Sequence, residues 1–150
     1  MSMLARYKKQ GGINQLVALL ETCLSKKRET LMNSVIAEDP VFAKQVQDKI
    51  LNCEKIFKWD PLLVCEATSR LSDRTLAIAL KGLPPECFAI ATHTMRELKK
   101  KEITNLLETI KPTPIEIESA HIKLVEKVRE LEKEGTVKFG PDNLPVKRTA

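Results

Sequence analysis

Aromatic residues are scarce in this sequence, which has one tryptophan, one tyrosine and four phenylalanines among 150 residues. They do not alternate with the basic residues, so the chain lacks the row of stacking rings on which proteins usually bind single-stranded nucleic acid. Long apolar runs are also missing. No stretch of about 18 apolar residues occurs that could span a membrane, and the basic N-terminus has no apolar core of a secretory signal.

Histidines and cysteines are few, and their spacing does not indicate a metal site or a catalytic centre. The two histidines and four cysteines form neither a Cys-x-x-Cys pair nor a set at zinc-ligand spacing. The glycine-rich phosphate loop, H-E-x-x-H and G-x-S-x-G are absent too. We therefore expect no enzyme activity, cofactor, metal or small-molecule substrate. The cysteines are expected to be reduced and mostly buried, and His121 is expected to be a structural residue of the last helix.

Helix-forming residues are plentiful. Leu, Lys and Glu are common, 30% of the residues are charged, and few segments alternate β-branched with polar residues. The composition predicts an all-α protein. The formal net charge of +5 has two local peaks, at residues 26–28 and 99–101, both near glutamates in helical segments. A solvated helix face is the favoured interpretation of these basic runs, and a phosphate-binding surface is the alternative.

Helix start and stop signals divide the chain into segments. Residues 1–12 are a basic segment that ends in a double glycine, and residues 13–50 are predicted to form a three-helix, armadillo-like unit. A hinge or linker is predicted at 51–61, a C-terminal helix bundle at 62–139, and a disordered tail at 140–150. Similar start signals recur at Leu24-Ser25 and Leu71-Ser72, which fits an armadillo-type repeat.

The segment from Ser72 to Gly82 is the most informative part of the chain, because it places a lysine at the end of a nearly all-apolar helix. Ser72 or Asp73 can cap the start of this helix, and Gly82 supplies the backbone at which helices commonly stop. Lys81 has two interpretations. It either caps the negative end of the helix dipole or is a cation that a rigid scaffold presents to a partner.

Several blocks of this sequence resemble the C-terminal region of one family, the flagellar motor switch protein FliG, which is a rotor subunit. The first block is Asp73-Arg74-x-Leu76-Ala77-x-Ala79-Leu80-Lys81-Gly82, with Glu86 soon after. The others are Gly11-Gly12-Ile13, Glu38-Asp39-Pro40, and Pro112 before a last helix that ends at Gly135. They occur in the family's order and at nearly its spacing.

The resemblance implies a function, a location and partners. It implies a component of the switch complex, or C-ring, of the flagellar rotor, involved in motility and chemotaxis. This component would be cytoplasmic, at the flagellar basal body on the inner face of the membrane. The implied partners are FliM, neighbouring FliG-like subunits and the cytoplasmic loop of the stator protein MotA. A nucleic-acid-binding or generic adaptor helical domain is the alternative function.

The resemblance also implies site residues. The hinge candidates are Gly11, Gly12, Ile50, Leu51, Asn52 and Cys53, although the last four lack the aromatic residues of the family's second hinge. The candidates for facing the stator are Lys81, Leu98, Lys101, Asn105 and Leu106. On the helix predicted near residues 95–110, the family carries one basic and two acidic residues. These positions align here with Leu98, Asn105 and Leu106. Because those positions are uncharged, we expect an altered or lost role in torque.

Overall fold

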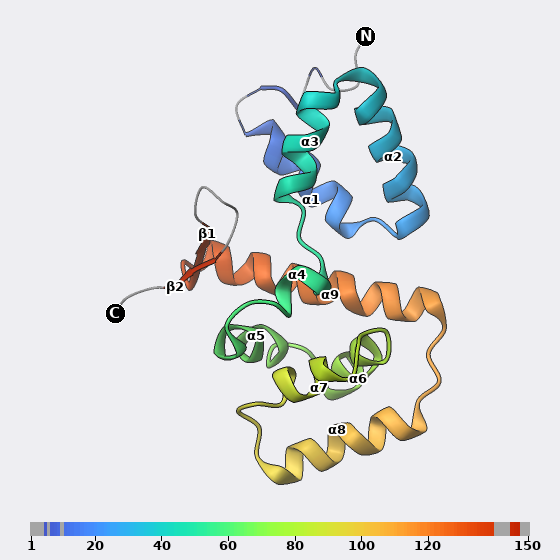
Figure 1. Cartoon of the computed structure of the whole chain (residues 1–150), viewed down its shortest axis with the longest axis vertical. Coiled ribbons are helices and arrows are strands. Elements are labelled where there is room, and N and C mark those ends of the chain that lie inside the picture. Colours follow the sequence, from blue (N-terminus) through green and yellow to red (C-terminus); the bar gives the residue numbers. More distant parts are fainter. Residues whose placement is uncertain (1–4, 6, 10, 140–144, 148–150) are drawn as a thin grey trace. The chain divides into compact units, whose positions relative to one another are not determined.

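The computed structural model describes residues 5, 7–9, 11–139 and 145–147 (Figure 1). The chain forms two compact units, Met1–Leu51 and Asn52–Ala150. The boundary between them lies within the predicted hinge candidates Ile50 to Cys53, here called the connector. The predicted movement at this connector stays a prediction.

The first unit is a three-helix unit built from α1 (Gly12–Thr22), α2 (Ser25–Glu38) and α3 (Pro40–Lys49). The start of α3 follows the predicted signal, because Asp39 accepts a hydrogen bond from Phe42 N at 3.1 Å and Pro40 is the first helical residue. The predicted start signal at Leu24-Ser25 lies at the beginning of α2, but Leu24 rather than Ser25 occupies the cap position. The core consists of Tyr7, Leu16, Val17, Leu20, Met32, Val35, Phe42, Ala43 and Val46.

Arg28 corrects the interpretation of the first basic run as a solvated face. Its Nε donates to Leu20 O at 2.8 Å, and its Nη2 donates to Cys23 O at 2.8 Å. These carbonyls belong to the end of α1, where the last helical oxygens lack partners within the helix. One residue of the run therefore closes α1, while Lys26 and Lys27 are exposed.

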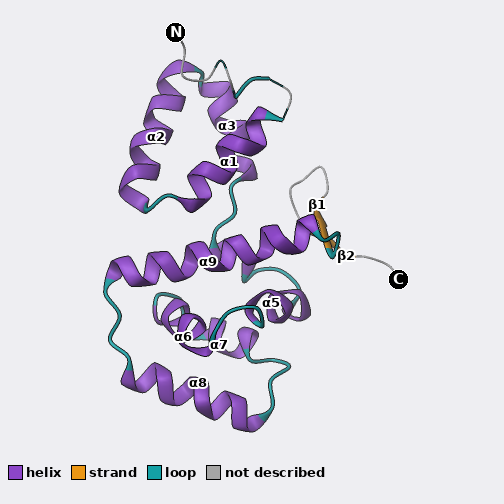
Figure 2. Ribbon diagram, turned by 180° about the vertical axis from the view of Figure 1, so that it is seen from behind, coloured by secondary structure: helices purple, strands orange, loops and turns teal. Residues whose placement is uncertain are grey.

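The second unit contains six helices and a strand pair within the described residues. These are α4 (Cys53–Ile56), α5 (Pro61–Thr68), α6 (Asp73–Lys81), α7 (Glu86–Ala91), α8 (Glu97–Thr109), α9 (Pro114–Lys133), β1 (Val137–Phe139) and β2 (Pro145–Lys147). The long helix α9 contacts α4, α5 and α6, and α8 packs on α6 (Figures 1 and 2). The central helix α6 is therefore held from two sides, by α8 and by α9.

The start and end of α9 follow local signals in the sequence. Thr113 accepts a hydrogen bond from Glu116 N at 3.2 Å, and Pro114 is the first helical residue. Gly135 ends the helix with a φ of 81°, a left-handed conformation that suits glycine. The buried stripe of α9 consists of Ala120, Leu124, Val125, Val128 and Leu131.

The predicted linker and tail are corrected by the structure. Residues 53–56 form α4, and buried side chains from Cys53 to Trp59 make this segment part of the second unit's core. In the predicted disordered tail, β2 pairs antiparallel with β1. The pairing is supported by Val137, which is buried, and by Phe139, whose ring lies 5.6 Å from that of Trp59. Tail residues 140–144 and 148–150 lie outside the described part. The fold is all-α with this short hairpin added.

Candidate functional site

The helix that carries Lys81 is largely buried, as predicted. Ser72 is its cap and accepts a hydrogen bond from Thr75 N at 3.2 Å. The buried residues are Leu76, Ala77, Ala79 and Leu80, whereas Lys81 is the last helical residue and is exposed. The structure thus places one exposed cation at the end of a helix that packs between α8 and α9.

Gly82 allows α6 and α9 to approach each other closely. A Cβ atom on this residue would overlap with Ile117 Cγ2 and would lie 3.2 Å from His121 Cε1. The backbone φ of Gly82 is −94°, so the position needs a glycine because of space rather than because of an unusual conformation. The backbone beside Lys81 is therefore packed against α9, while the lysine side chain is in solvent.

The helix α8 presents three of the predicted residues on one face. Leu98 is 72% exposed, and Lys101 and Asn105 are exposed as well. These three residues, here called the α8 outer face, lie opposite Ile103, which is fully buried against the rest of the unit. Leu106 does not belong to the outer face, because it is half-buried on the flank of the helix.

Two of the three consecutive lysines at the start of α8 are paired with carboxylates. Lys99 Nζ lies 2.5 Å from Asp73 Oδ1 at the start of α6, and this hydrogen bond raises the pKa of Lys99 above its ordinary value. Lys100 Nζ lies 3.6 Å from Glu97 Oε1. Among the described residues, Lys101 makes no ion pair. The basic run is therefore not a uniform cationic surface, which argues against phosphate binding.

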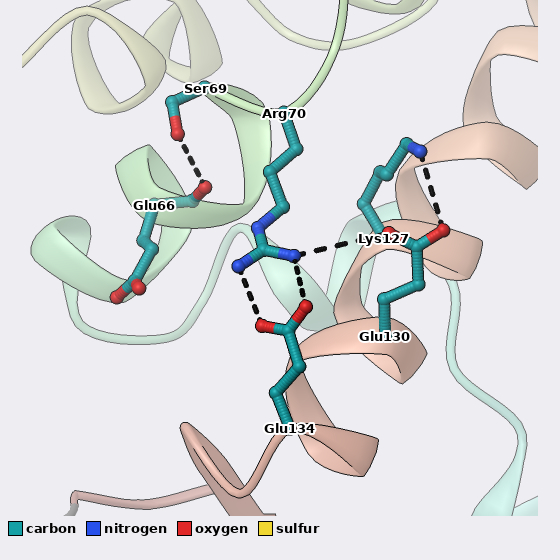
Figure 3. A network of polar contacts seen from close by, with 6 residues as sticks. All are labelled: Glu66, Ser69, Arg70, Lys127, Glu130 and Glu134. Atoms are coloured by element: carbon teal, nitrogen blue, oxygen red, sulfur yellow. Dashed lines mark hydrogen bonds and ion pairs between the residues drawn. The ribbon is translucent and has the colours of Figure 1, made fainter.

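An arginine that sequence reasoning missed, in the turn after α5, pairs with the end of α9 (Figure 3). Arg70 Nη1 and Nη2 donate to the two carboxylate oxygens of Glu134 at 2.8 and 2.7 Å. These bonds lower the pKa of Glu134 below its ordinary range. Glu130 stands 4.0 Å from Arg70 and 3.3 Å from Lys127. Arg70 and Glu134 are 64 residues apart in sequence, so no local pattern could have revealed this pair.

The double glycine forms a tight turn at the start of α1. Gly11 has a φ of 80°, and Gly12 donates to Lys9 O at 2.9 Å. A Cβ on Gly12 would overlap with the backbone of Tyr7, whose side chain is buried in the first unit. Whether the two glycines also act as a hinge stays a prediction.

The connector is anchored by hydrogen bonds on both sides of the boundary between the units. Ile50 N donates to Val46 O at 3.1 Å, and Leu51 N donates to Glu21 Oε2 at 2.8 Å. Beyond the boundary, Asn52 Oδ1 accepts from Lys55 N at 2.9 Å and caps α4. Sequence reasoning missed Glu21, which is only 3% exposed.

Cys53 is the first residue of α4, and it is fixed to α9. Its Sγ donates to His121 O at 3.8 Å, and burial raises the pKa of its thiol to about 12. All four cysteines are free and buried, as expected from the sequence. The described part of the chain gathers no cluster of side chains that could hold a metal ion. Within it, no helix is both long enough and apolar enough to cross a membrane.

A family model described as the FliG C-terminal domain matches residues 33–139. The chain belongs to the FliG C-terminal domain family. Curated proteins named flagellar motor switch protein FliG are similar to it. The protein from Aquifex aeolicus is 28% identical over 123 residues, which cover 81% of this chain and 38% of that protein. The protein from Thermotoga maritima is 24% identical over 132 residues, which cover 87% of this chain and 39% of that protein.

Two solved structures have a similar fold. Full-length FliG from Aquifex aeolicus has a TM-score of 0.54 at 27% identity, and the match covers 83% of this chain and 39% of that chain. The structure of FliG residues 116–343 from H. pylori has a TM-score of 0.56 at 17% identity, and the match covers 83% of this chain and 56% of that chain. The second likeness concerns the fold alone.

The match to the FliG family model includes Lys81, the α8 outer face and the connector. Gly11, Gly12 and Glu21 precede the matched residues, and β2 follows them. The residues that align with the family's torque positions therefore lie on elements that the family model covers, whereas the double glycine rests on the sequence resemblance.

Proposed function

We propose that this chain is a component of a flagellar rotor, within the switch complex on the cytoplasmic side of the membrane. Its role would be to dock other motor proteins rather than to catalyse a reaction. Membership of the FliG C-terminal domain family and the names of the curated relatives support this proposal. The proposed partners are FliM, neighbouring FliG-like subunits and the cytoplasmic loop of MotA.

The observation that carries the proposal is the α8 outer face together with Lys81. Leu98, at 72% exposure, is a large apolar side chain in water, and it lies on a helix that Ile103 and the Lys99–Asp73 pair hold in place. Leu98 would add buried apolar area to any contact that covers this face, and burial of apolar area favours association. We propose that this face, and Lys81 at the end of α6, contact the stator or another rotor protein.

The chemistry of this face supports an altered form of torque transfer. An exposed ion pair contributes only about 0.2–1 kcal/mol and is screened beyond about 8 Å at physiological salt. Contact through charges alone therefore needs several charges on a rigid surface. The outer face has one cation, Lys101, beside an apolar and an amide side chain. Contact at Leu98 would instead bury apolar area, which depends little on salt.

The proposed movement of the two units would take place at the connector. The hydrogen bond from Leu51 N to Glu21 fixes the connector on one side, and the cap formed by Asn52 fixes it on the other. The backbone bonds between these two anchors are the proposed pivot. ¹⁵N relaxation measurements would test this proposal, since a pivot requires separate rotational correlation times for the two units.

Binding measurements on the full chain test the docking role. The chain would be immobilised and exposed to FliM, to the MotA cytoplasmic loop and to a random DNA duplex, at low and physiological salt. We expect Leu98→Asp to weaken binding to a motor protein at least tenfold. Leu62 is the matched control, because it is 52% exposed on α5 and lies outside the proposed face.

Two results would contradict the proposal. One is equal binding to the motor protein by wild type, Leu98→Asp and Leu62→Asp, because the outer face would then not be the contact. The other is tight binding to the duplex that falls steeply with salt while neither motor protein binds, because that is the behaviour of a nucleic-acid-binding domain.

A further inference from the structure

His121 makes a hydrogen bond to the end of α6 with its ring. Nε2 lies 2.9 Å from Ala79 O, and because a carbonyl oxygen only accepts, Nε2 must carry the proton of this bond. Ala79 O is one of the last carbonyls of α6, which have no partner within the helix. The same oxygen also accepts from Gly82 N at 3.2 Å. The ring thus closes the end of the helix that carries Lys81.

Ile117 contacts the same corner from one helical turn earlier on α9. Its Cγ2 occupies the space that a Cβ on Gly82 would need, and the ring of His121 borders that space on the other side. Leu80, immediately before Lys81, is buried. The backbone on both sides of Lys81 is therefore fixed, although its side chain is exposed.

The backbone oxygen of His121 holds a second element. It accepts from Cys53 Sγ at 3.8 Å, a distance suited to a weak bond from sulfur. Cys53 begins α4, directly after the connector, and its thiol is protonated at neutral pH, where burial raises its pKa further, to about 12. One residue of α9 therefore touches both the first helix after the connector and the end of α6.

We propose that His121 is a positioning residue that fixes Lys81 and ties α4 to the Lys81 corner. This inference rests on the proposed function, because it takes Lys81 as a contact point for a motor protein. A displacement of α4 along α9 would move the peptide group of His121. The hydrogen bond from the His121 ring to Ala79 O would then transmit this movement to the end of α6. His121 would then link the pivot to the contact surface.

Amide hydrogen exchange tests the fixing of Lys81. His121→Phe keeps a planar ring but removes the donor, so we expect the Gly82 and Leu83 amides to exchange at least tenfold faster. His93→Phe is the matched control, because His93 is the chain's other histidine and is exposed. The amide of Val35, buried in the core of the first unit, is the reference and is expected to keep its wild-type rate.

A second variant separates positioning from packing. His121→Gln retains an N–H donor and is expected to recover most of the protection of Gly82. The wild-type imidazole should also show a protonated Nε2 in a ¹⁵N–¹H spectrum, unlike a freely exchanging His93. Unchanged exchange at Gly82 in His121→Phe, or no recovery of its protection in His121→Gln, would overturn the positioning role.

The link to α4 is tested by combining two substitutions. Cys53→Ala is expected to shift the backbone amide signal of Gly82 in the wild-type background, and this shift should fall at least twofold when His121→Phe is also present. Cys23→Ala, in the first unit, is the control for losing a buried thiol. An unmoved Gly82 signal in Cys53→Ala, or an equal shift in both backgrounds, would overturn the link.

These measurements need no partner, so they can fail independently of the proposed function. If no motor protein binds but His121→Phe exposes Gly82 to exchange, the rotor role is wrong and the positioning role stands. If a motor protein binds through Lys81 but His121→Phe changes neither its affinity nor the exchange at Gly82, the rotor role stands and the positioning role is wrong.

Discussion

Replacement of Glu21 by Met tests how firmly the connector is held to the first unit. Glu21 is 3% exposed, and its carboxylate accepts the Leu51 N–H at 2.8 Å. Methionine has a similar length but no oxygen, so the variant leaves the Leu51 N–H without this acceptor while filling most of the same volume. Leu51 is itself only 6% exposed, so little water can replace the lost acceptor.

The cost follows from the burial of both groups. A buried donor that loses its partner costs about 1–3 kcal/mol, and a hydrogen bond to a charged group is at the upper end of the usual contributions. We therefore expect Glu21→Met to lower the free energy of unfolding by about 2 kcal/mol. Domains are usually stable by about 5–15 kcal/mol, so the change is a large fraction of the total.

Urea unfolding can assign the loss to one unit. Circular dichroism reports helices of both units, whereas the fluorescence of Trp59, the only tryptophan, reports the second unit. If the units unfold separately, Glu21→Met should shift a circular-dichroism transition and leave the fluorescence midpoint in place. A joint shift would mean that the two units unfold together.

Two further variants decide whether the hydrogen bond is the cause. Glu21→Gln keeps an oxygen that can accept from Leu51 N, so its loss should be smaller, below about 1 kcal/mol. Glu29→Met, on an exposed position of α2, should change stability by less than about 0.5 kcal/mol. Equal losses for Glu21→Met and Glu21→Gln would refute the reasoning, because the acceptor oxygen would then contribute nothing.

Three other substitutions test the second unit, each by urea unfolding of the full chain. Gly82→Ala should destabilise by about 1–3 kcal/mol despite alanine's better helix propensity, because its Cβ overlaps with Ile117; a stabilised variant would contradict the close approach. Glu134→Gln should destabilise at pH 7 and not in acid. Arg70 lowers the pKa of Glu134, so the ion pair contributes its stability above the ordinary value of 4.5 and loses it as the pH falls through the lowered pKa. A stability difference between wild type and Glu134→Gln that persists in acid would contradict this. Ile103→Ala should cost about 2–5 kcal/mol, and a smaller loss would mean that α8 is not anchored there.

The parts of the fold that could be predicted are those that neighbouring residues determine. The cap of α3 at Asp39, the cap of α9 at Thr113 and the stop of α9 at Gly135 all depend on side chains within a few positions of the helix end. The apolar run of α6 and the regularly spaced apolar residues of α9 are also visible in the local sequence, and they form the buried faces of the two helices.

Contacts between distant residues could not be predicted in the same way. The ring of His121 and Ala79 O are 42 residues apart, and Glu21 and Leu51 are 30 residues apart. Nothing in the local sequence selects one partner among many carbonyls or amides. The strand Val137–Phe139 was missed for a related reason, since three residues are too few for a period and its partner strand follows an intervening loop.

The rotation of α8 about its axis explains why only part of the predicted stator-facing set lies outward. Successive residues of a helix are about 100° apart, so Leu98, Lys101 and Asn105 lie about 140–160° from Ile103. Leu106 lies only about 60° from Ile103, which draws it toward the buried side. One buried side chain thus separates two adjacent positions that the alignment had placed on one ridge. Any partner that docks on α8 would meet Leu98 and Asn105 directly, and it would reach Leu106 only at the edge of the contact.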